Sequence, residues 1–148
     1  MIRIMFVCHG NICRSPMAEF IMKDLVKKRG LQDRFIIESS AISTEEIGNF
    51  MYSATKAQLK KKGIEYTERR AVQLKSEDYN KYDHIICMDS RNLNGIQRII
   101  TNDHERKIKK LLDYTNGKDI DDPWYTGRFD IAFDDILSGC EAFLDKLI

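Results

Sequence analysis

The feature that most constrains this chain is an apolar run, Ile2–Val7, that passes directly into the polar segment CHGNICRSP. A short, continuous run rich in β-branched residues is typical of a central parallel strand that is buried on both faces. The residues after this segment carry an apolar stripe at helical spacing, and this predicts a helix with Ser15 as N-cap, Pro16 as first residue and Gly30 at its end. The chain therefore opens with a strand, a polar loop and a helix, which is the unit from which α/β folds are built.

The same alternation continues along the chain and predicts one α/β domain over residues 1–148. We expect further strands over residues 35–41, 84–88 and 108–112, and further helices over 53–63, about 93–100 and 129–147. Asp89 or Ser90 is expected to cap the helix after the third strand. Residues 116–127 (NGKDIDDPWYTG) are rich in Gly, Asp and Pro, and we expect them to form a loop. Strands that alternate with helices imply a parallel sheet with right-handed crossovers.

Composition and charge exclude several classes of function. The 148 residues contain 24 Lys and Arg against 23 Asp and Glu, and a net charge of +1 argues against a dedicated nucleic-acid-binding protein. The first residues do not resemble a signal peptide, and no apolar run approaches the roughly 20 residues needed to span a membrane. We therefore interpret the four cysteines as thiols of a cytoplasmic protein, and their spacing does not favour a zinc site.

The loop between Cys8 and Ser15 is expected to bind an anion. In open α/β sheets, ligands lie beyond the carboxyl ends of the strands, where we expect this loop. A loop that leads into a helix N-terminus can direct several backbone N–H groups at one point. Gly10 should allow backbone geometry that other residues cannot adopt, and Asn11 tolerates the left-handed region. Arg14 adds a planar guanidinium that matches two phosphate oxygens.

The same surroundings favour the thiolate of Cys8, which is the nucleophilic form of a cysteine. One loop can thus hold a phosphoryl group and supply the thiol that attacks it, and the Cys8-x5-Arg14 spacing is what a cysteine-based phosphatase needs. A poor leaving group also needs a proton, and Asp122 in DDPWYTG is the best candidate to donate it. The proline after it holds this aspartate in extended geometry, and Trp124 and Tyr125 can form the walls of an aryl-binding cleft.

These motifs resemble those of the low molecular weight protein tyrosine phosphatases. VCHGNICRSP is similar to the nucleophile loop of that family, YDHIICMDSRNL to its third-strand segment, and DDPWYTG to its late Asp-Pro-aromatic loop. The motifs lie in matching order over nearly the whole chain. The resemblance implies a flavodoxin-like, three-layer fold of the phosphotyrosine phosphatase I type, with a four-stranded parallel sheet and helices on both faces. It also implies hydrolysis of phosphotyrosine monoesters without a metal or other cofactor.

The resemblance assigns the chemistry to three side chains. Cys8 would form a phosphocysteine intermediate, Arg14 would bind the phosphoryl oxygens, and Asp122 would act first as general acid and then as general base. The implied partners are phosphotyrosine-containing proteins, small aryl phosphates, and inhibitory oxyanions such as inorganic phosphate. The implied state of the protein is a cytoplasmic monomer.

The resemblance also implies supporting roles. Asn11 and Ser15 would hold the loop shape, Asp89 would lie behind the loop, and Cys13 would capture an oxidised Cys8 in a reversible disulfide. We expect the substrate to contact loop residues and both aromatic side chains, namely His9, Gly10, Asn11, Ile12, Cys13, Ser15, Trp124 and Tyr125.

The chain departs from the family in two regions. Where the family often has a histidine in an H-x-A-R-Q-like stretch, this chain has RRAVQL, with Arg69 and Val72 at the matching places. Where mammalian members carry an aromatic residue after the second strand, this chain has Glu45. We expect these differences to affect loop support and substrate preference more than the chemistry.

Three alternative functions stay open. Protein-arginine phosphatases resemble this sequence but tend to carry threonine at the position of Ile12, so Ile12 favours phosphotyrosine. Thioredoxin-coupled arsenate reductases relay oxidation through two further cysteines near the third strand, where this chain has only Cys87, which we expect to be buried in that strand. A catalytically silent phosphate- or phosphopeptide-binding module would need neither the Cys8 thiol nor the Asp122 acid.

Overall fold

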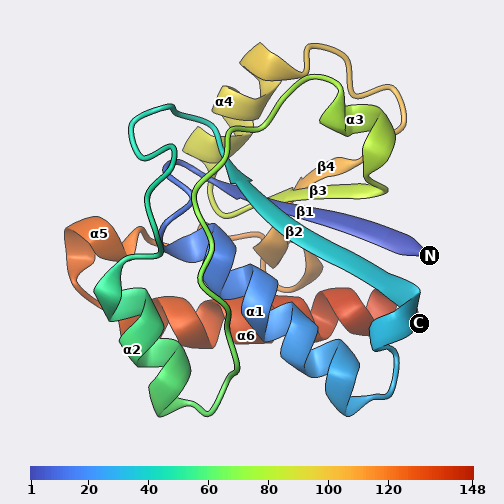
Figure 1. Ribbon diagram of the computed structural model, residues 1–148. Coiled ribbons are helices and arrows are strands. Elements are labelled where there is room, and N and C mark those ends of the chain that lie inside the picture. Colours follow the sequence, from blue (N-terminus) through green and yellow to red (C-terminus); the bar gives the residue numbers. More distant parts are fainter.

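A four-stranded parallel sheet forms the centre of the computed structural model, which describes residues 1–148 (Figure 1). The strands lie in the order β2-β1-β3-β4, and every neighbouring pair is parallel. Their bounds are Ile2–Cys8 for β1, Phe35–Ala41 for β2, His84–Cys87 for β3 and Ile108–Lys110 for β4. The predicted parallel sheet is therefore confirmed, and β1 is an inner strand of it.

Helices cover both faces of the sheet, as predicted (Figure 1). One face carries α1 (Arg14–Lys28), α2 (Ser53–Lys61) and α6 (Phe129–Leu147). The other face carries the short α3 (Asp78–Lys81) and α4 (Ser90–Ile99). Figure 1 also shows α5 (Pro123–Thr126) at the end of the molecule where β1 passes into α1. The arrangement is a three-layer α/β fold.

The side chains of β1 alternate between two apolar cores. Ile4 and Phe6 point into the core under α1 and α6, and Met5 and Val7 point into the core under α3 and α4. All four are nearly or completely buried, and burial of side chains of this size contributes about 1.5–3 kcal/mol each. The uninterrupted apolar run at the start of the sequence thus reflects a strand that is covered on both sides.

The first helix begins two residues earlier than the sequence predicts. It starts at Arg14 with Cys13 as N-cap, and Cys13 makes no side-chain capping bond. The prediction of Ser15 as N-cap and Pro16 as first helical residue is therefore wrong. The Ser15 hydroxyl is occupied elsewhere, because it accepts a hydrogen bond from Asn11 Nδ2 at 2.7 Å. The Ser15 hydroxyl therefore stabilises the loop between Cys8 and Ser15 and does not cap the helix.

Other boundaries also differ from the prediction: α2 ends at Lys61 and β3 at Cys87, two residues and one residue before their predicted ends. The helix α4 begins at Ser90, earlier than the predicted start near residue 93, and Asp89 caps it, one of the two predicted caps, by accepting a hydrogen bond from Asn92 N at 2.7 Å. The strand β4 ends at Lys110, where a 3-10 turn, Leu111–Tyr114, replaces its predicted last residues. The predicted loop at 116–127 contains α5, whose proline at the first turn is compatible with a helix start.

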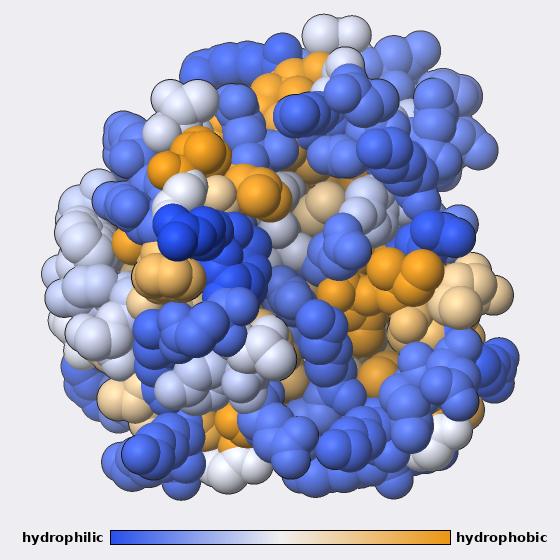
Figure 2. All heavy atoms as spheres, viewed as in Figure 1, coloured by the Kyte–Doolittle hydropathy of each residue, from blue (hydrophilic) through white to orange (hydrophobic).

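Hydrophilic side chains cover most of the face shown in Figure 2, with smaller apolar patches between them. None of the helices has the length and apolar character that crossing a bilayer requires.

Candidate active site

The site is built around Cys8, the last residue of β1, whose sulfur lies inside the curve of the loop that leads into α1. The backbone N–H groups of Asn11 and Ser15 point at Cys8 Sγ, at 3.3 and 3.4 Å. The Ser15 hydroxyl is also hydrogen-bonded to this sulfur, at 3.0 Å. The predicted convergence of donors on one point is thus confirmed, and negative charge on Cys8 Sγ would be stabilised by it.

Asn11 holds the loop in this shape. Its φ angle is 61°, in the left-handed region, as the sequence predicts for an asparagine here. Its Nδ2 donates to Ser15 Oγ at 2.7 Å and to Ser39 Oγ at 3.0 Å. Its Oδ1 accepts from Arg69 Nη2 at 2.6 Å and from the Val72 backbone N–H at 3.2 Å. The buried amide therefore has partners on both ends, which fixes the turn of the loop.

Gly10 serves the site differently from the prediction. It does not have a positive φ, so the unusual backbone conformation belongs to Asn11 and not to the glycine. A Cβ atom on Gly10 would lie 3.3 Å from Cγ of Glu46, which is tighter than ordinary van der Waals contact. The glycine leaves room for the Glu46 side chain beside the loop.

Arg69, which in the sequence is visible only as a departure from the family pattern, supports the loop. Besides its bond to the Asn11 side chain, its guanidinium donates to the backbone carbonyls of Asn11 at 3.1 Å and Ser39 at 3.3 Å. The buried Glu19 lies 3.5 Å from Arg69 Nε and accepts from Ser39 Oγ at 2.6 Å. Glu19 interrupts the apolar residues of the first helix, and that interruption was the signal for a buried polar network.

Arg14 links the loop to the rest of the site. Its side chain is only 2% exposed, and Nη1 donates to Asp89 Oδ2 at 2.7 Å and to the Ile120 carbonyl at 2.6 Å. Its Nη2 reaches Asp122 Oδ2 at 3.4 Å. Burial alone would lower the pKa of Arg14, but the negative charges of Cys8, Asp89 and Asp122 outweigh burial and raise it. Asp89 is thus in direct contact with the arginine of the loop.

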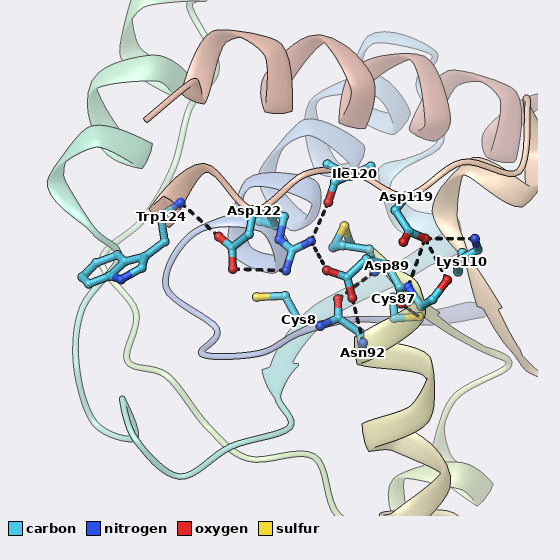
Figure 3. Close-up of polar contacts among 12 residues, drawn as sticks. Cys8, Cys87, Asp89, Asn92, Lys110, Asp119, Ile120, Asp122 and Trp124 are labelled. Carbon is cyan, nitrogen blue, oxygen red and sulfur yellow. Dashed lines mark hydrogen bonds and ion pairs between the residues drawn. The ribbon is translucent and has the colours of Figure 1, made fainter. Parts of the chain in front are cut away.

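Asp122 lies across the guanidinium from Asp89 (Figure 3). It is the N-cap of α5, and its Oδ1 accepts from the Trp124 backbone N–H at 3.0 Å. This bond fixes the rotation of the carboxyl group, so that Oδ2 is the oxygen directed at Arg14. Figure 3 shows the Cys8 sulfur close to the Asp122 carboxyl group, and both residues line the same cavity.

A small cavity of about 130 Å³ joins these groups. Nine of its lining residues were predicted as site residues: Cys8, His9, Gly10, Ile12, Cys13, Arg14, Asp122, Trp124 and Tyr125. The other two are Glu45, which the sequence marked as a departure from the family, and Glu46, which it did not mark. Asn11 and Ser15, also predicted to contact substrate, do not line the cavity with their buried side chains, and their backbone N–H groups point at Cys8 Sγ.

The rim of the cavity is partly aromatic and partly charged. Trp124 is 51% exposed and Tyr125 80% exposed, so both aromatic faces are available at the opening. His9 and Glu45 also line the cavity, and His9 Nε2 lies 3.3 Å from Glu45 Oε2. Glu45 thus places an acidic side chain on the rim, and the exposed aromatic faces suit a flat ring above a pocket of hydrogen-bond donors.

The other three cysteines lack such surroundings. Burial, with the charge of Cys8 nearby, raises the pKa of Cys13 to about 12. Burial, with the charge of Asp89 nearby, raises the pKa of Cys87 to about 12, and burial also raises that of Cys140. Cys87 is fully buried in β3, as predicted, and all four cysteines are free thiols. No group of three or more His, Cys, Asp or Glu side chains is arranged to hold a metal ion.

Comparisons with known proteins point to one family. The model of the low molecular weight phosphotyrosine protein phosphatases matches residues 3–148. The low molecular weight protein-tyrosine-phosphatase YfkJ of Bacillus subtilis is 39% identical over 150 residues, covering 99% of this chain and 96% of YfkJ. Its crystal structure matches with a TM-score of 0.95 at 38% identity, covering 99% of this chain and 94% of that one.

Two further relatives bear on the substrate. The low molecular weight phosphotyrosine protein phosphatase of Rattus norvegicus is 37% identical over 149 residues, covering 97% of this chain and 94% of that protein. The crystal structure of a drosophila arginine phosphatase matches with a TM-score of 0.87 at 32% identity, covering 97% of this chain and 96% of that one.

Proposed function

Because the chain belongs to the low molecular weight phosphotyrosine protein phosphatase family, we propose that it hydrolyses phosphotyrosine in proteins, with Cys8 as nucleophile. The observation that carries the proposal is the environment of one sulfur atom. Two backbone N–H groups point at Cys8 Sγ, and Arg14 and Asp122 line the same small cavity. A protein that only bound phosphate would need neither a thiol nor an acid at this point.

In the first step, the Cys8 thiolate attacks phosphorus and a sulfur–phosphorus bond forms while the bond to the tyrosine oxygen breaks. Arg14 and the loop N–H groups bind the phosphoryl oxygens, whose charge they stabilise in the transition state. Asp89 and the Ile120 carbonyl hold Nη1 of Arg14, so the guanidinium is oriented before substrate arrives. Small aryl phosphates would react in the same way, and inorganic phosphate would inhibit as a product.

Asp122 carries the proton. In its protonated form it donates to the departing tyrosine oxygen, since a phenolate is a poor leaving group. In the second step it accepts a proton from water, which attacks phosphorus, breaks the sulfur–phosphorus bond and releases inorganic phosphate. Its fixed Oδ1 and its Oδ2 beside Arg14 support this double role, and no cofactor takes part in either step.

Phosphoarginine is the second candidate substrate, because an arginine phosphatase is among the similar structures. The cavity favours phosphotyrosine: Ile12 lines it with an apolar side chain, and two aromatic rings stand at its rim. A threonine hydroxyl at that position could contact a phosphorylated guanidinium, which Ile12 cannot do.

The test is kcat/KM for a phosphotyrosine peptide and a phosphoarginine peptide of the same sequence, with Cys8→Ser as the blank. We expect strong preference for phosphotyrosine and a gain in relative phosphoarginine activity in Ile12→Thr. Preference for phosphoarginine by the wild type would overturn the substrate assignment. If the protein hydrolysed neither peptide, the proposal that it is a protein phosphatase would be wrong.

We further propose a cytoplasmic monomer whose Cys13 protects Cys8 from oxidation. Both cysteines line one cavity, and the four free thiols suit a reducing compartment. Peroxide would oxidise Cys8 to a sulfenic acid, and the Cys13 thiol would displace water to form a disulfide. Thiol-dependent recovery after peroxide should therefore be lower in Cys13→Ser, and equal recovery would contradict this role.

A further inference from the structure

A second and larger cavity adjoins the catalytic pocket. Its volume is about 720 Å³, and it shares five lining residues with the small cavity: His9, Arg14, Glu45, Asp122 and Tyr125. We call this cavity the α4 groove, because α4 forms one of its walls. When a phosphotyrosine side chain is bound in the catalytic pocket, the residues that flank it in the substrate would lie along this groove.

Arginines mark the α4 wall of the groove. Arg91, Asn94 and Arg98 line it, are exposed, and lie at helical spacing along one face of α4. Seven residues of helix place the two arginines about 10 Å apart along the axis. That distance corresponds to about three residues of extended peptide.

The two walls are held against each other at the end near the catalytic pocket. Asp119, on the wall opposite α4, accepts hydrogen bonds from the Ser90 backbone N–H and hydroxyl, each at 3.0 Å. Lys110 Nζ also donates to Asp119 at 3.0 Å (Figure 3). On the groove floor, a Cβ atom on Gly95 would lie 2.8 Å from Ile42 Cγ2, so α4 packs closely on the loop after β2. The groove is therefore a formed surface.

Most carboxylates in the groove are already paired. Asp89 and Asp122 contact Arg14, Asp119 contacts Lys110, and Glu45 contacts His9. Asp121 is the one acidic lining residue without a basic partner, and it lies in the segment opposite α4.

The two arginines of the α4 wall, in contrast, have no ionic partner in the protein. Neither Arg91 nor Arg98 has a carboxylate oxygen within 4.0 Å, although both line a cavity that contains five acidic residues. The groove is thus polarised, with free positive charge along α4 and free negative charge at Asp121. An acidic ligand side chain would be attracted along α4 and repelled from the other wall.

Building on the proposed phosphotyrosine hydrolysis, we propose that the α4 groove binds the substrate segment beside the phosphotyrosine and selects acidic side chains through Arg91 and Arg98. Arginine suits this task because its guanidinium pairs with a carboxylate through two parallel hydrogen bonds. The two arginines would recognise two positions of the same peptide, separated by about three residue lengths.

The test compares phosphotyrosine peptides in which a single glutamate or lysine is moved through the flanking positions. For the wild type we expect two positions on one side of the phosphotyrosine at which kcat/KM is about three- to tenfold higher for the glutamate peptide than for the lysine peptide. Arg91→Glu with Arg98→Glu should reverse this preference. Arg91→Ala should remove it nearer the phosphotyrosine, and Arg98→Ala farther away.

A matched control separates the groove from the general charge of the protein. Arg34→Glu with Lys146→Glu makes the same charge change at exposed residues outside the groove, and it should keep the wild-type preference. The proposed role of the groove would be wrong if the ratio of kcat/KM for glutamate and lysine peptides were the same in the wild type and in the Arg91→Glu, Arg98→Glu variant. It would also be wrong if both double variants lost this preference to the same extent. A small aryl phosphate, which does not reach α4, should be hydrolysed at the same rate by all variants. Failure of the wild type on that substrate would count against the proposed function itself.

Discussion

Two cysteines end neighbouring strands of the same sheet, yet their surroundings differ completely. Cys8 ends β1 and Cys87 ends β3, and Val7 stands beside Cys87 in the register of the two strands. Both side chains are buried. Two backbone N–H groups and a hydroxyl surround the Cys8 sulfur, whereas the Cys87 sulfur makes only a long contact, 3.7 Å, with the Asp89 carbonyl.

The difference arises from one residue of register and from the segment after each strand. Because side chains alternate, Cys8 points to the α1 face of the sheet and Cys87 to the α4 face. After Cys8, a left-handed Asn11 turns the loop back so that its N–H groups meet the sulfur. After Cys87, the Asp89 side chain accepts the hydrogen bond from the Asn92 N–H at the start of α4, so this N–H does not point at the Cys87 sulfur. A thiol at a strand end becomes a candidate nucleophile only where the backbone after it encloses the sulfur.

The largest expected effect comes from removing the enclosed thiol. Cys8→Ser should lower kcat by about 10⁴-fold or more, because the serine hydroxyl is not ionised at neutral pH. Binding of inorganic phosphate should persist, since the loop N–H groups remain. Steady-state kinetics and phosphate titration measure both quantities. Residual turnover near that of the wild type would remove Cys8 as nucleophile.

Next in size is the loss of the acid. Asp122→Asn should lower kcat by about 10²–10⁴-fold on substrates with poor leaving groups, because no group then protonates the phenolate. For nitrophenyl phosphate, the rate of transfer of the phosphoryl group to Cys8 should decrease less, because nitrophenolate leaves without needing a proton to the same extent. Asp121→Asn is the matched control and should change kcat by less than about threefold. If the two variants behaved alike, the acid would be another group or water.

Loop support should matter less than the reacting groups. Arg69→Ala removes the bonds to Asn11 and Ser39, and it should lower kcat/KM about tenfold through a loosened loop. The inhibition constant of inorganic phosphate should rise with it, because the same N–H groups bind phosphate. The exposed neighbour provides the comparison: Arg70→Ala should leave both constants unchanged. Unchanged phosphate inhibition in Arg69→Ala would reject the positioning role.

The smallest effect is expected at the second strand end. Cys87→Ala should leave kcat within about twofold of the wild type, because the sulfur has no part in the proposed chemistry. It should lower the free energy of unfolding by about 1 kcal/mol through the small cavity that it leaves. Denaturant unfolding and steady-state kinetics on one sample test both. A large loss of activity with unchanged stability would give Cys87 a role that its surroundings do not explain.

The fold was largely predictable because its strands and longer helices carry their own periodicity. The bounds of β2 and α6 agree with the prediction, and a four-residue helix such as α3 has too few turns to show a periodic pattern. The start of α1 was mispredicted because Ser15 satisfies both a capping rule and the needs of the loop, and the loop takes its hydroxyl. Local rules fail where a tertiary contact competes for the same atom.

The site was predictable where its residues lie close together in sequence. Cys8 and Arg14 share one loop, and Asp122 has the motif DDPW around it. Contacts from distant segments could not be read in this way, as with the Ile120 carbonyl on Arg14 or Arg69 on Asn11. The position of Glu46 at the cavity was not predicted for a similar reason, because it depends on the close approach of the Glu46 side chain to Gly10.

The most direct test of the account is rapid-quench mass spectrometry of the Asp122→Asn variant mixed with nitrophenyl phosphate. In this variant the intermediate should accumulate, because the base that activates water is missing while the leaving group departs without help. Peptide mapping is predicted to find one phosphoryl group on Cys8 and none on Cys13, Cys87 or Cys140. A phosphoryl group on another residue, or steady turnover with no covalent intermediate in any quenched sample, would contradict the account.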